Sequence, residues 1–340
     1  MDIQTAINNV INHVDLDRQD MKNVMQTIMR GDATAAQIGG LLVALRMKGE
    51  TVDEITAAAE VMRQLATKVD VDKTNLIDTC GTGGDDSNTF NISTTSAFVV
   101  AASGAKVAKH GNRSVSSKSG SADVLEAAGI NIELNVEQVA NCIENIGIGF
   151  MFAPMHHSAM KHAIGPRREL GVRTLFNVLG PLTNPASAPN QVIGVFDKKW
   201  LKPLAKTLKQ LGSNHVLVVH SEDGMDEISI SAKTFVTELK DNEINSYEVS
   251  PTDFDIKTFD LKDLSVENTD ESLTLMKSVF SNNNDAAKAI VSLNAGAAIY
   301  ASGISDSIKA GVEMAINIIE SGAAQKKFDM LITHTQSFKT

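Results

Sequence analysis

The sequence predicts an α/β protein with a small N-terminal α-helical domain and a larger α/β domain built on a central, mainly parallel sheet. Residues 1–68 carry apolar side chains at helical spacing, whereas short apolar runs alternate with helical stretches after Val69, as in βα units. At 340 residues the chain can form about two domains, each with its own core. We therefore expect a helical domain at 1–68, completed by helices around 158–185, and an α/β domain at 69–340.

Apolar spacing and turn residues predict the elements in order. A first helix is expected from Ile3 to Val14 and another around 38–45, and Thr51 with Glu54 forms a capping-box pattern before the next helix. Strands are expected at 76–77, 107–108, 147–152, 192–196 and 215–220, with β-rich sequence at 228–249. Helices are expected after 91–94 and at 199–211, 285–302 and 305–322.

Composition excludes several classes of protein. The chain has 31 basic and 41 acidic residues, a net charge of −10, and is only 4% aromatic, which argues against a nucleic-acid-binding protein. Cys80 and Cys142 form no CxxC motif, and no apolar run reaches the roughly 18 residues that a membrane span needs. The N-terminus has no signal-peptide pattern, so we expect a cytoplasmic protein.

The charge is unevenly distributed along the chain. Residues 221–271 contain 15 acidic and 4 basic residues, a local balance of −11. Residues 87–122 contain four cations, Lys106, Lys109, Arg113 and Lys118, and no carboxylate. This basic segment predicts a site for a small anion.

A glycine loop and a helix start follow the first expected strand. The loop, 81–85, reads GTGGD, and Asn91-Ile-Ser-Thr94 then begins an apolar helical run. Glycines let backbone N–H groups approach phosphate oxygens, and a helix N-terminus favours negative charge. The loop lacks the Rossmann GxGxxG and P-loop GK[ST] patterns, so we interpret it as a different kind of phosphate-binding loop.

Three further segments carry candidate site residues. The segment 109–123, KHGNRSVSSKSGSAD, is rich in cations, hydroxyls and amides that could surround a polyanion. Asp226 and Glu227 lie on an expected turn and suit Mg²⁺, which prefers hard oxygen ligands. Arg167 or Arg168 could pair with a carboxylate. We interpret His156, His157 and His162 as ordinary helix-face histidines rather than zinc ligands, because they have no HExxH spacing.

Together these segments resemble the anthranilate phosphoribosyltransferase family, which has a nucleoside-phosphorylase-type fold. The resemblance rests on 81–85, 91–94, 109–123, RRELGVRTLFNVLGPLTNP at 167–185 and DGMDEIS at 223–229, in family order. It implies transfer of the phosphoribosyl group of phosphoribosyl pyrophosphate to the amino group of anthranilate, a step of tryptophan biosynthesis. It also implies Mg²⁺, two ions per site, and a homodimer.

The resemblance assigns roles to individual residues. Lys109 and Arg113 would stabilise the transition state, and no residue would act as a nucleophile. Ser93, Asp226 and Glu227 would hold the metal. Anthranilate would meet Gly81, His110, Asn112, Arg167 and Pro181, with Arg168 as the alternative to Arg167. The phosphoribosyl pyrophosphate site would comprise Gly81, Gly84, Asp85, Thr89, Asn91, Ile92, Ser93, Thr94, Lys109, His110, Gly111, Asn112, Arg113, Ser114, Val115, Ser116, Ser117 and Ser121.

Two rival functions remain open at this point. A pyrimidine nucleoside phosphorylase is similar in architecture, but it does not need a pair of magnesium carboxylates. A non-catalytic relative that binds nucleic acid would need a basic surface, which the net charge of −10 disfavours.

Overall fold

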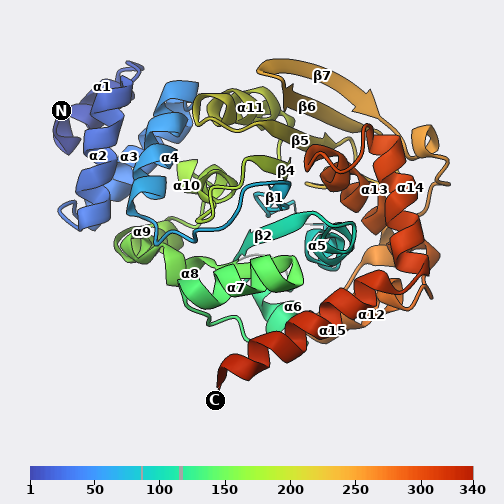
Figure 1. Ribbon diagram of the computed structural model, residues 1–340. Helices are drawn as coiled ribbons and strands as arrows, with labels where there is room; N and C mark the ends of the chain where they lie inside the picture. The colour runs from blue at the N-terminus through green and yellow to red at the C-terminus, as the bar shows by residue number, and fades with distance from the viewer. Residues whose placement is uncertain (86, 115–117, 340) are drawn as a thin grey trace.

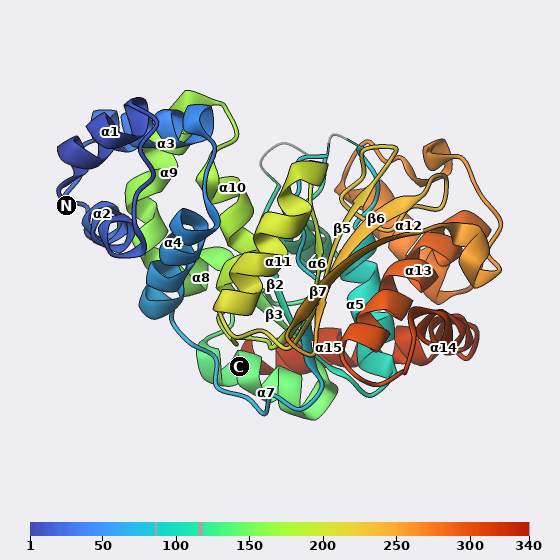
Figure 2. The same cartoon turned by 90° about the horizontal axis from the view of Figure 1, so that it is seen from above.

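The computed structural model describes residues 1–85, 87–114 and 118–339. A helical bundle that contains the N-terminus lies beside a larger α/β unit, and both views show this division (Figures 1 and 2). None of the helices in the described part of the chain combines the length and apolarity that crossing a bilayer requires.

Residues from two parts of the chain form the helical bundle. Asp2, Asp17, Thr34 and Thr51 each cap a helix by accepting a hydrogen bond from the backbone N–H three residues later. The capping box of Thr51 and Glu54 is confirmed. The N-terminal helices are α1 (Ile3–Ile11), α2 (Arg18–Arg30), α3 (Ala35–Lys48) and α4 (Val52–Leu65), and the later ones are α8 (Ala153–His156), α9 (Lys161–Leu170) and α10 (Leu175–Leu179). The expected extension of the first helix to Val14 is wrong, because the chain turns after Ile11 and leaves Val14 51% exposed.

Seven strands form a single sheet in the order β3-β2-β1-β4-β5-β6-β7. The first five are parallel and the last two antiparallel, which confirms a mainly parallel sheet. The strands are β1 (Leu76–Asp78), β2 (Lys106–Gly111), β3 (Ile148–Phe152), β4 (Asn190–Gly194), β5 (His215–Ser221), β6 (Thr234–Lys240) and β7 (Glu243–Val249). The β-rich expectation for 228–249 is confirmed only from Thr234, because residues 228–233 are bends and irregular backbone outside any strand.

Helices cover both faces of the sheet. On one side, α5 packs against α13 and α15, and on the other α11 lies between the sheet and α4 (Figure 2). The remaining helices are α5 (Ile92–Ala102), α6 (Ser121–Ala127), α7 (Val136–Ile146), α11 (Leu201–Gln210), α12 (Thr269–Phe280), α13 (Asp285–Ala301), α14 (Ile308–Glu320) and α15 (Ala323–Gln336). The sequence patterns did not predict α6, α7, α12 or α15.

The alternation of side chains along β5 divides the core in two. Leu217 and Val219 join the cluster beneath α5 and α13, whereas Val216 and Val218 join the cluster that includes α11 and the whole bundle. The bundle therefore shares one continuous apolar core with a face of the sheet.

The strand order locates the site. Successive strands β1, β2 and β3 run outward in one direction, and β4 returns to the other side of β1. Ligands of open α/β sheets bind at the carboxyl ends of the strands where the order reverses, which here is between β1 and β4. The glycine loop follows β1 directly, so the predicted phosphate loop lies at this position.

Candidate active site

The glycine loop is held against β4 and against the acidic turn. The backbone N–H of Thr82 donates to the Gly194 carbonyl at 2.8 Å, and that of Gly83 donates to Asp226 Oδ2 at 2.8 Å. Gly83 and Gly84 have φ angles of +63° and +78°, which side chains rarely tolerate. These two positions therefore need glycine for their conformation.

The acidic turn follows β5 and packs tightly on β4. A Cβ atom at Gly194 would lie 1.4 Å from the Asp226 carbonyl oxygen. Only glycine therefore permits the close approach of β4 to the turn. Asn294 of α13 holds the next residue, Ile228, through its backbone N–H and carbonyl, both at 2.9 Å. The carboxylates of Asp226 and Glu227 are thus positioned by β4, β5 and α13.

Three carboxylates lie close together at this turn. Burial and the nearby Asp85 charge raise the pKa of Asp226 to about 7. Burial and the Asp226 charge raise the pKa of Glu227 well above its ordinary value, while the Lys109 cation opposes the rise. A divalent cation would relieve this repulsion, and the donor set, carboxylates with the nearby Ser93, is the hard-oxygen set that Mg²⁺ prefers.

The N-terminus of α5 faces the same region. The Ser93 backbone N–H bonds to Glu227, and Lys109 Nζ lies 3.4 Å from Ser93 Oγ and 2.7 Å from the Thr79 carbonyl oxygen. The Thr94 hydroxyl is buried, and within the described residues it has no hydrogen-bond partner. An unpartnered buried hydroxyl beside a helix N-terminus suits an anionic oxygen of a ligand.

Asn91 connects α5 to two other segments. Its amide oxygen accepts hydrogen bonds from Ser119 Oγ at 3.1 Å and from Ser272 Oγ at 2.7 Å. Ile92, the first residue of α5, is buried, and Thr89 forms an isolated bridge with Ser265. These contacts join the helix N-terminus to the segment 109–123.

The segment 109–123 divides into a buried and an exposed part. Lys109 and His110 are buried on β2, and Lys109 acts on the acidic cluster, whereas Asn112 and Arg113 are exposed. Ser114 donates its N–H to Asp123 and Ser121 donates its hydroxyl to the Asn112 carbonyl. Val115, Ser116 and Ser117 lie outside the described residues.

Arg113 is engaged by acidic side chains in this structure. Its guanidinium pairs with Asp123 at 3.2 Å and Glu126 at 2.7 Å, and it lies over the Phe152 ring. To act on pyrophosphate, as the resemblance implies, Arg113 has to exchange these partners for the ligand.

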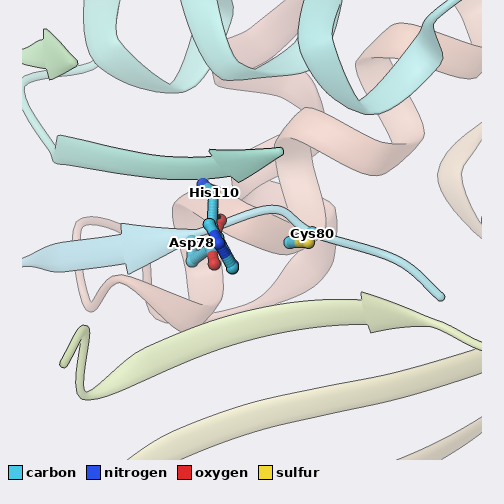
Figure 3. A group of neighbouring side chains, drawn as sticks. All are labelled: Asp78, Cys80 and His110. Carbon is cyan, nitrogen blue, oxygen red and sulfur yellow. Dashed lines mark hydrogen bonds between the residues drawn. The ribbon is translucent and has the colours of Figure 1, made fainter. Parts of the chain in front are cut away.

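A group beneath the loop consists of Asp78 and His110, which are buried, and Cys80, which is half-buried (Figure 3). One ligand atom from each lies within 4.8 Å of the others, a grouping that could hold a metal. The Asp78 oxygens, however, already accept from the His110 backbone N–H at 3.1 Å and from the Asn184 amide at 2.7 Å. Burial also raises the pKa of the Cys80 thiol, which disfavours a thiolate ligand. We interpret this group as a structural support that joins β1, β2 and residue 184.

Two further buried histidines, His156 and His157, lie near His110. The rings of His110 and His157 are 5.1 Å apart, and burial lowers the pKa of His110 to about 3 and that of His157 to about 4. His156 is also buried, and its Nδ1 lies 3.0 Å from the Thr67 carbonyl oxygen. The interpretation of His156 and His157 as ordinary helix-face histidines is wrong, because both side chains are buried and His157 lies after the end of α8.

The structure distinguishes the two adjacent arginines. Arg167 is partly buried over the Phe176 ring, at 5.2 Å, whereas Arg168 is exposed. Pro181 is buried in the short 3₁₀ helix η2 (Gly180–Thr183). Its carbonyl oxygen accepts a hydrogen bond from the Gln191 side-chain amide.

Sequence reasoning missed several supporting residues, namely Asp78, Asn184, Gly194, Asn294 and Ser272. Asp78 was detectable, because a carboxylate inside an apolar strand has to find buried partners. The other four gave no signal, since their role depends on which segments become neighbours.

The geometry is that expected of an α/β protein with a site for a phosphorylated ligand and a divalent cation where the strand order reverses. Comparison with protein families agrees. Residues 73–325 match the α/β domain of a glycosyl transferase family, and residues 4–66 match the helical bundle domain of that family.

Individual relatives narrow the class. The chain is 60% identical to an anthranilate phosphoribosyltransferase of Thioalkalivibrio sulfidiphilus, over 99% of this chain and 100% of the relative. A crystal structure of the Thermus thermophilus enzyme superposes with a TM-score of 0.92 at 39% identity, over 97% of this chain and 99% of the other. The Saccharomyces cerevisiae enzyme in complex with PRPP and Mg superposes with a TM-score of 0.89 at 26% identity, over 98% of each chain. The chain belongs to the anthranilate phosphoribosyltransferase family of glycosyltransferases.

Proposed function

We propose that this chain transfers the phosphoribosyl group of 5-phosphoribosyl 1-pyrophosphate to the amino group of anthranilate, in tryptophan biosynthesis. The main structural support is the convergence of the glycine loop, the α5 N-terminus and the acidic turn at the carboxyl ends of β1 and β5. The anthranilate nitrogen forms a bond to the ribose C1 carbon, the bond from C1 to the pyrophosphate oxygen breaks, and the nitrogen loses a proton.

The proposed donor site comprises the residues assigned above, namely Gly81, Gly84, Asp85, Thr89, residues 91–94, residues 109–117 and Ser121. Loop amides and the α5 N-terminus would bind pyrophosphate oxygens, and Lys109 and Arg113 would stabilise the charge that grows on the leaving group. When bound, Mg²⁺ neutralises part of that charge. Ser93, Asp226 and Glu227 would hold it.

We propose two Mg²⁺ ions per site. With the donor bound, its pyrophosphate adds to the negative charge of Asp85, Asp226 and Glu227, and the sum would exceed what Lys109 and one divalent cation neutralise. Calorimetric titration of Mg²⁺ into the protein with the donor present should give a stoichiometry of two, and a stoichiometry of one contradicts this count.

The acceptor would bind between the bundle and the sheet. Arg167 would pair with the anthranilate carboxylate, Asn112 and Gly81 would contact it, and His110 and Pro181 would line the path of the ring. The inward position of Arg167 over Phe176 favours it over the exposed Arg168. A nucleophilic side chain is unnecessary, because the amine of anthranilate is neutral and attacks directly.

Anthranilate fluorescence tests the proposal. Purified protein, phosphoribosyl pyrophosphate and Mg²⁺ should remove the anthranilate signal with stoichiometric release of pyrophosphate, and EDTA should stop the reaction. Phosphorolysis of a pyrimidine nucleoside, without loss of anthranilate, would instead support the nucleoside phosphorylase alternative. Retention of DNA at moderate salt without turnover would support the nucleic-acid-binding one.

We also propose a homodimer formed through α1, α3 and α9. These helices line an apolar groove, and Ile11 and Met47 at its edge are 62% and 79% exposed. Light scattering should give twice the chain mass, and Met47→Glu should give a monomer.

The two unpaired cysteines suit a reducing compartment, and we propose the cytoplasm.

A further inference from the structure

We propose that Arg173 is a positioning residue for the pyrophosphate donor, one that connects the helical bundle to the glycine loop and holds the peptide between Gly84 and Asp85 in one orientation. Arg173 is absent from the donor, acceptor and metal sets assigned above. The nature of the donor rests on the proposed function.

The backbone of Arg173 belongs to the bundle. It lies in the connection between α9 and α10, directly before Thr174, the N-cap residue of α10. Its carbonyl accepts a hydrogen bond from Arg46 of α3. Leu175 and Phe176, which follow, are buried in the bundle core. The position of this backbone is therefore determined by the bundle.

The side chain of Arg173 extends to the other part of the site. Its Nη2 atom donates to the Gly84 carbonyl, and its guanidinium carbon lies 4.4 Å from the centroid of the Phe196 ring. Phe196 follows β4, and its backbone N–H donates to Thr82 Oγ1 at 3.1 Å. Arg173 thus contacts the glycine loop directly at Gly84. It also contacts Phe196, which is hydrogen-bonded to Thr82 near the start of the loop.

The contact depends on the conformation of Gly84. A Cβ atom there would lie 3.4 Å from Arg173 Nη2, and the φ angle of +78° already excludes most side chains. The guanidinium therefore packs on bare backbone, at the loop residue that the resemblance assigns to the donor.

Peptide geometry explains how this contact orders the loop. In a trans peptide the carbonyl and the following N–H point in opposite directions. Because Arg173 binds the Gly84 carbonyl, the N–H of Asp85 is directed away from the arginine. A carbonyl oxygen that points at a phosphate repels it. Because the Gly84 carbonyl is bound to the Arg173 guanidinium, it is kept from pointing at the phosphate of the donor. A planar, charged donor that also stacks on an aromatic ring suits this task better than lysine does.

Substitution of Arg173 should change the KM for the donor much more than the KM for the acceptor. We expect Arg173→Gln to raise the KM for phosphoribosyl pyrophosphate about tenfold and to leave the KM for anthranilate within about twofold. Arg173→Lys keeps the charge and should restore the donor KM only in part. Arg30→Ala, at an exposed arginine that ends α2, is the matched control and should leave both values unchanged.

Hydrogen exchange gives a readout that is independent of turnover. Amides of residues 81–85 should exchange faster in Arg173→Gln than in the unsubstituted protein, and the protection gained on adding pyrophosphate with Mg²⁺ should be smaller. Phe196→Leu should give a weaker effect of the same kind, and it carries the test if Arg173→Gln does not fold.

Two results would overturn the proposal. One is unchanged exchange at 81–85 in the folded variants, and the other is an equal rise in both KM values, which indicates a merely structural role. A protein that lacks transferase activity would refute the proposed function alone, because exchange with pyrophosphate and Mg²⁺ still reports whether Arg173 orders the loop.

Discussion

Gly83 and Asp226 are 143 positions apart in the chain, yet the Gly83 N–H donates to the Asp226 carboxylate at 2.8 Å. The glycine loop and the acidic turn are therefore one hydrogen-bonded unit. A change in the acidic turn should consequently affect both the bound cation and the conformation of the loop.

Removal of the two carboxylates should mainly impair use of the donor. We expect Asp226→Ala combined with Glu227→Ala to lower kcat/KM for phosphoribosyl pyrophosphate by roughly 100-fold or more, because Mg²⁺ loses its anionic ligands. Steady-state kinetics with each substrate and Mg²⁺ varied would measure the effect. An equal loss for both substrates at saturating Mg²⁺ would argue against this assignment.

The two adjacent arginines should differ in their effect on the acceptor. Arg167→Ala should raise the KM for anthranilate by about 10- to 100-fold, which corresponds to the loss of a charge-assisted pair. Arg168→Ala should change it by less than about twofold, because the side chain is exposed. Kinetics with anthranilate varied would decide, and the reverse order of effects would assign the role to Arg168.

Gly194→Ala should displace the acidic turn. The new methyl group would overlap the Asp226 carbonyl oxygen, which lies 1.4 Å from the Cβ position. We expect a loss of stability of about 1–3 kcal/mol, typical of overpacking, and weaker Mg²⁺ binding. Chemical denaturation and Mg²⁺ titration would measure both.

Gly165→Ala is the control for that substitution. A Cβ atom there meets nothing within 4 Å, the position is exposed in α9, and helix propensity favours alanine. If both substitutions have the same effect on Mg²⁺ binding, the close packing of β4 on the turn is not the cause.

The buried histidine should make stability depend on pH. Burial lowers the pKa of His110 from 6.5 to about 3, so between these values the unfolded chain binds a proton that the folded chain does not. The stability present above pH 6.5 is thus lost as the pH falls, by about 2 kcal/mol at pH 5 for one such group.

A variant that lacks the His110 imidazole distinguishes the effect of His110 on stability from that of other titrating groups. One such group is Asp78, because burial raises the pKa of its carboxyl to about 6. On going from pH 7.5 to pH 5, His110→Gln should gain about 2 kcal/mol relative to the unsubstituted protein. Urea unfolding of both proteins at each pH would measure the difference. A difference that does not change with pH would show that His110 titrates normally.

Local patterns predicted much of the fold and the main segments of the site. The helical start, the strands around 76, 107 and 148, and the capping box at Thr51 follow from periodicity and backbone chemistry within a few residues. The expected end of the first helix at Val14 was wrong because apolar spacing alone cannot locate a chain turn. The inward orientation of His156 and His157 likewise depends on β2 and η2, which are distant in sequence.

By itself the sequence determined the α/β class, the glycine loop and the acidic pair, since each of these follows from short runs of neighbouring residues. Only the tertiary structure decided that β4 returns beside β1, that Gly194 admits the acidic turn, that Arg167 rather than Arg168 turns inward, and that Arg173 reaches Gly84. The physical reason is that these relationships are contacts between distant segments. They depend on strand order and on which face of each element packs against the core, and a local pattern contains neither.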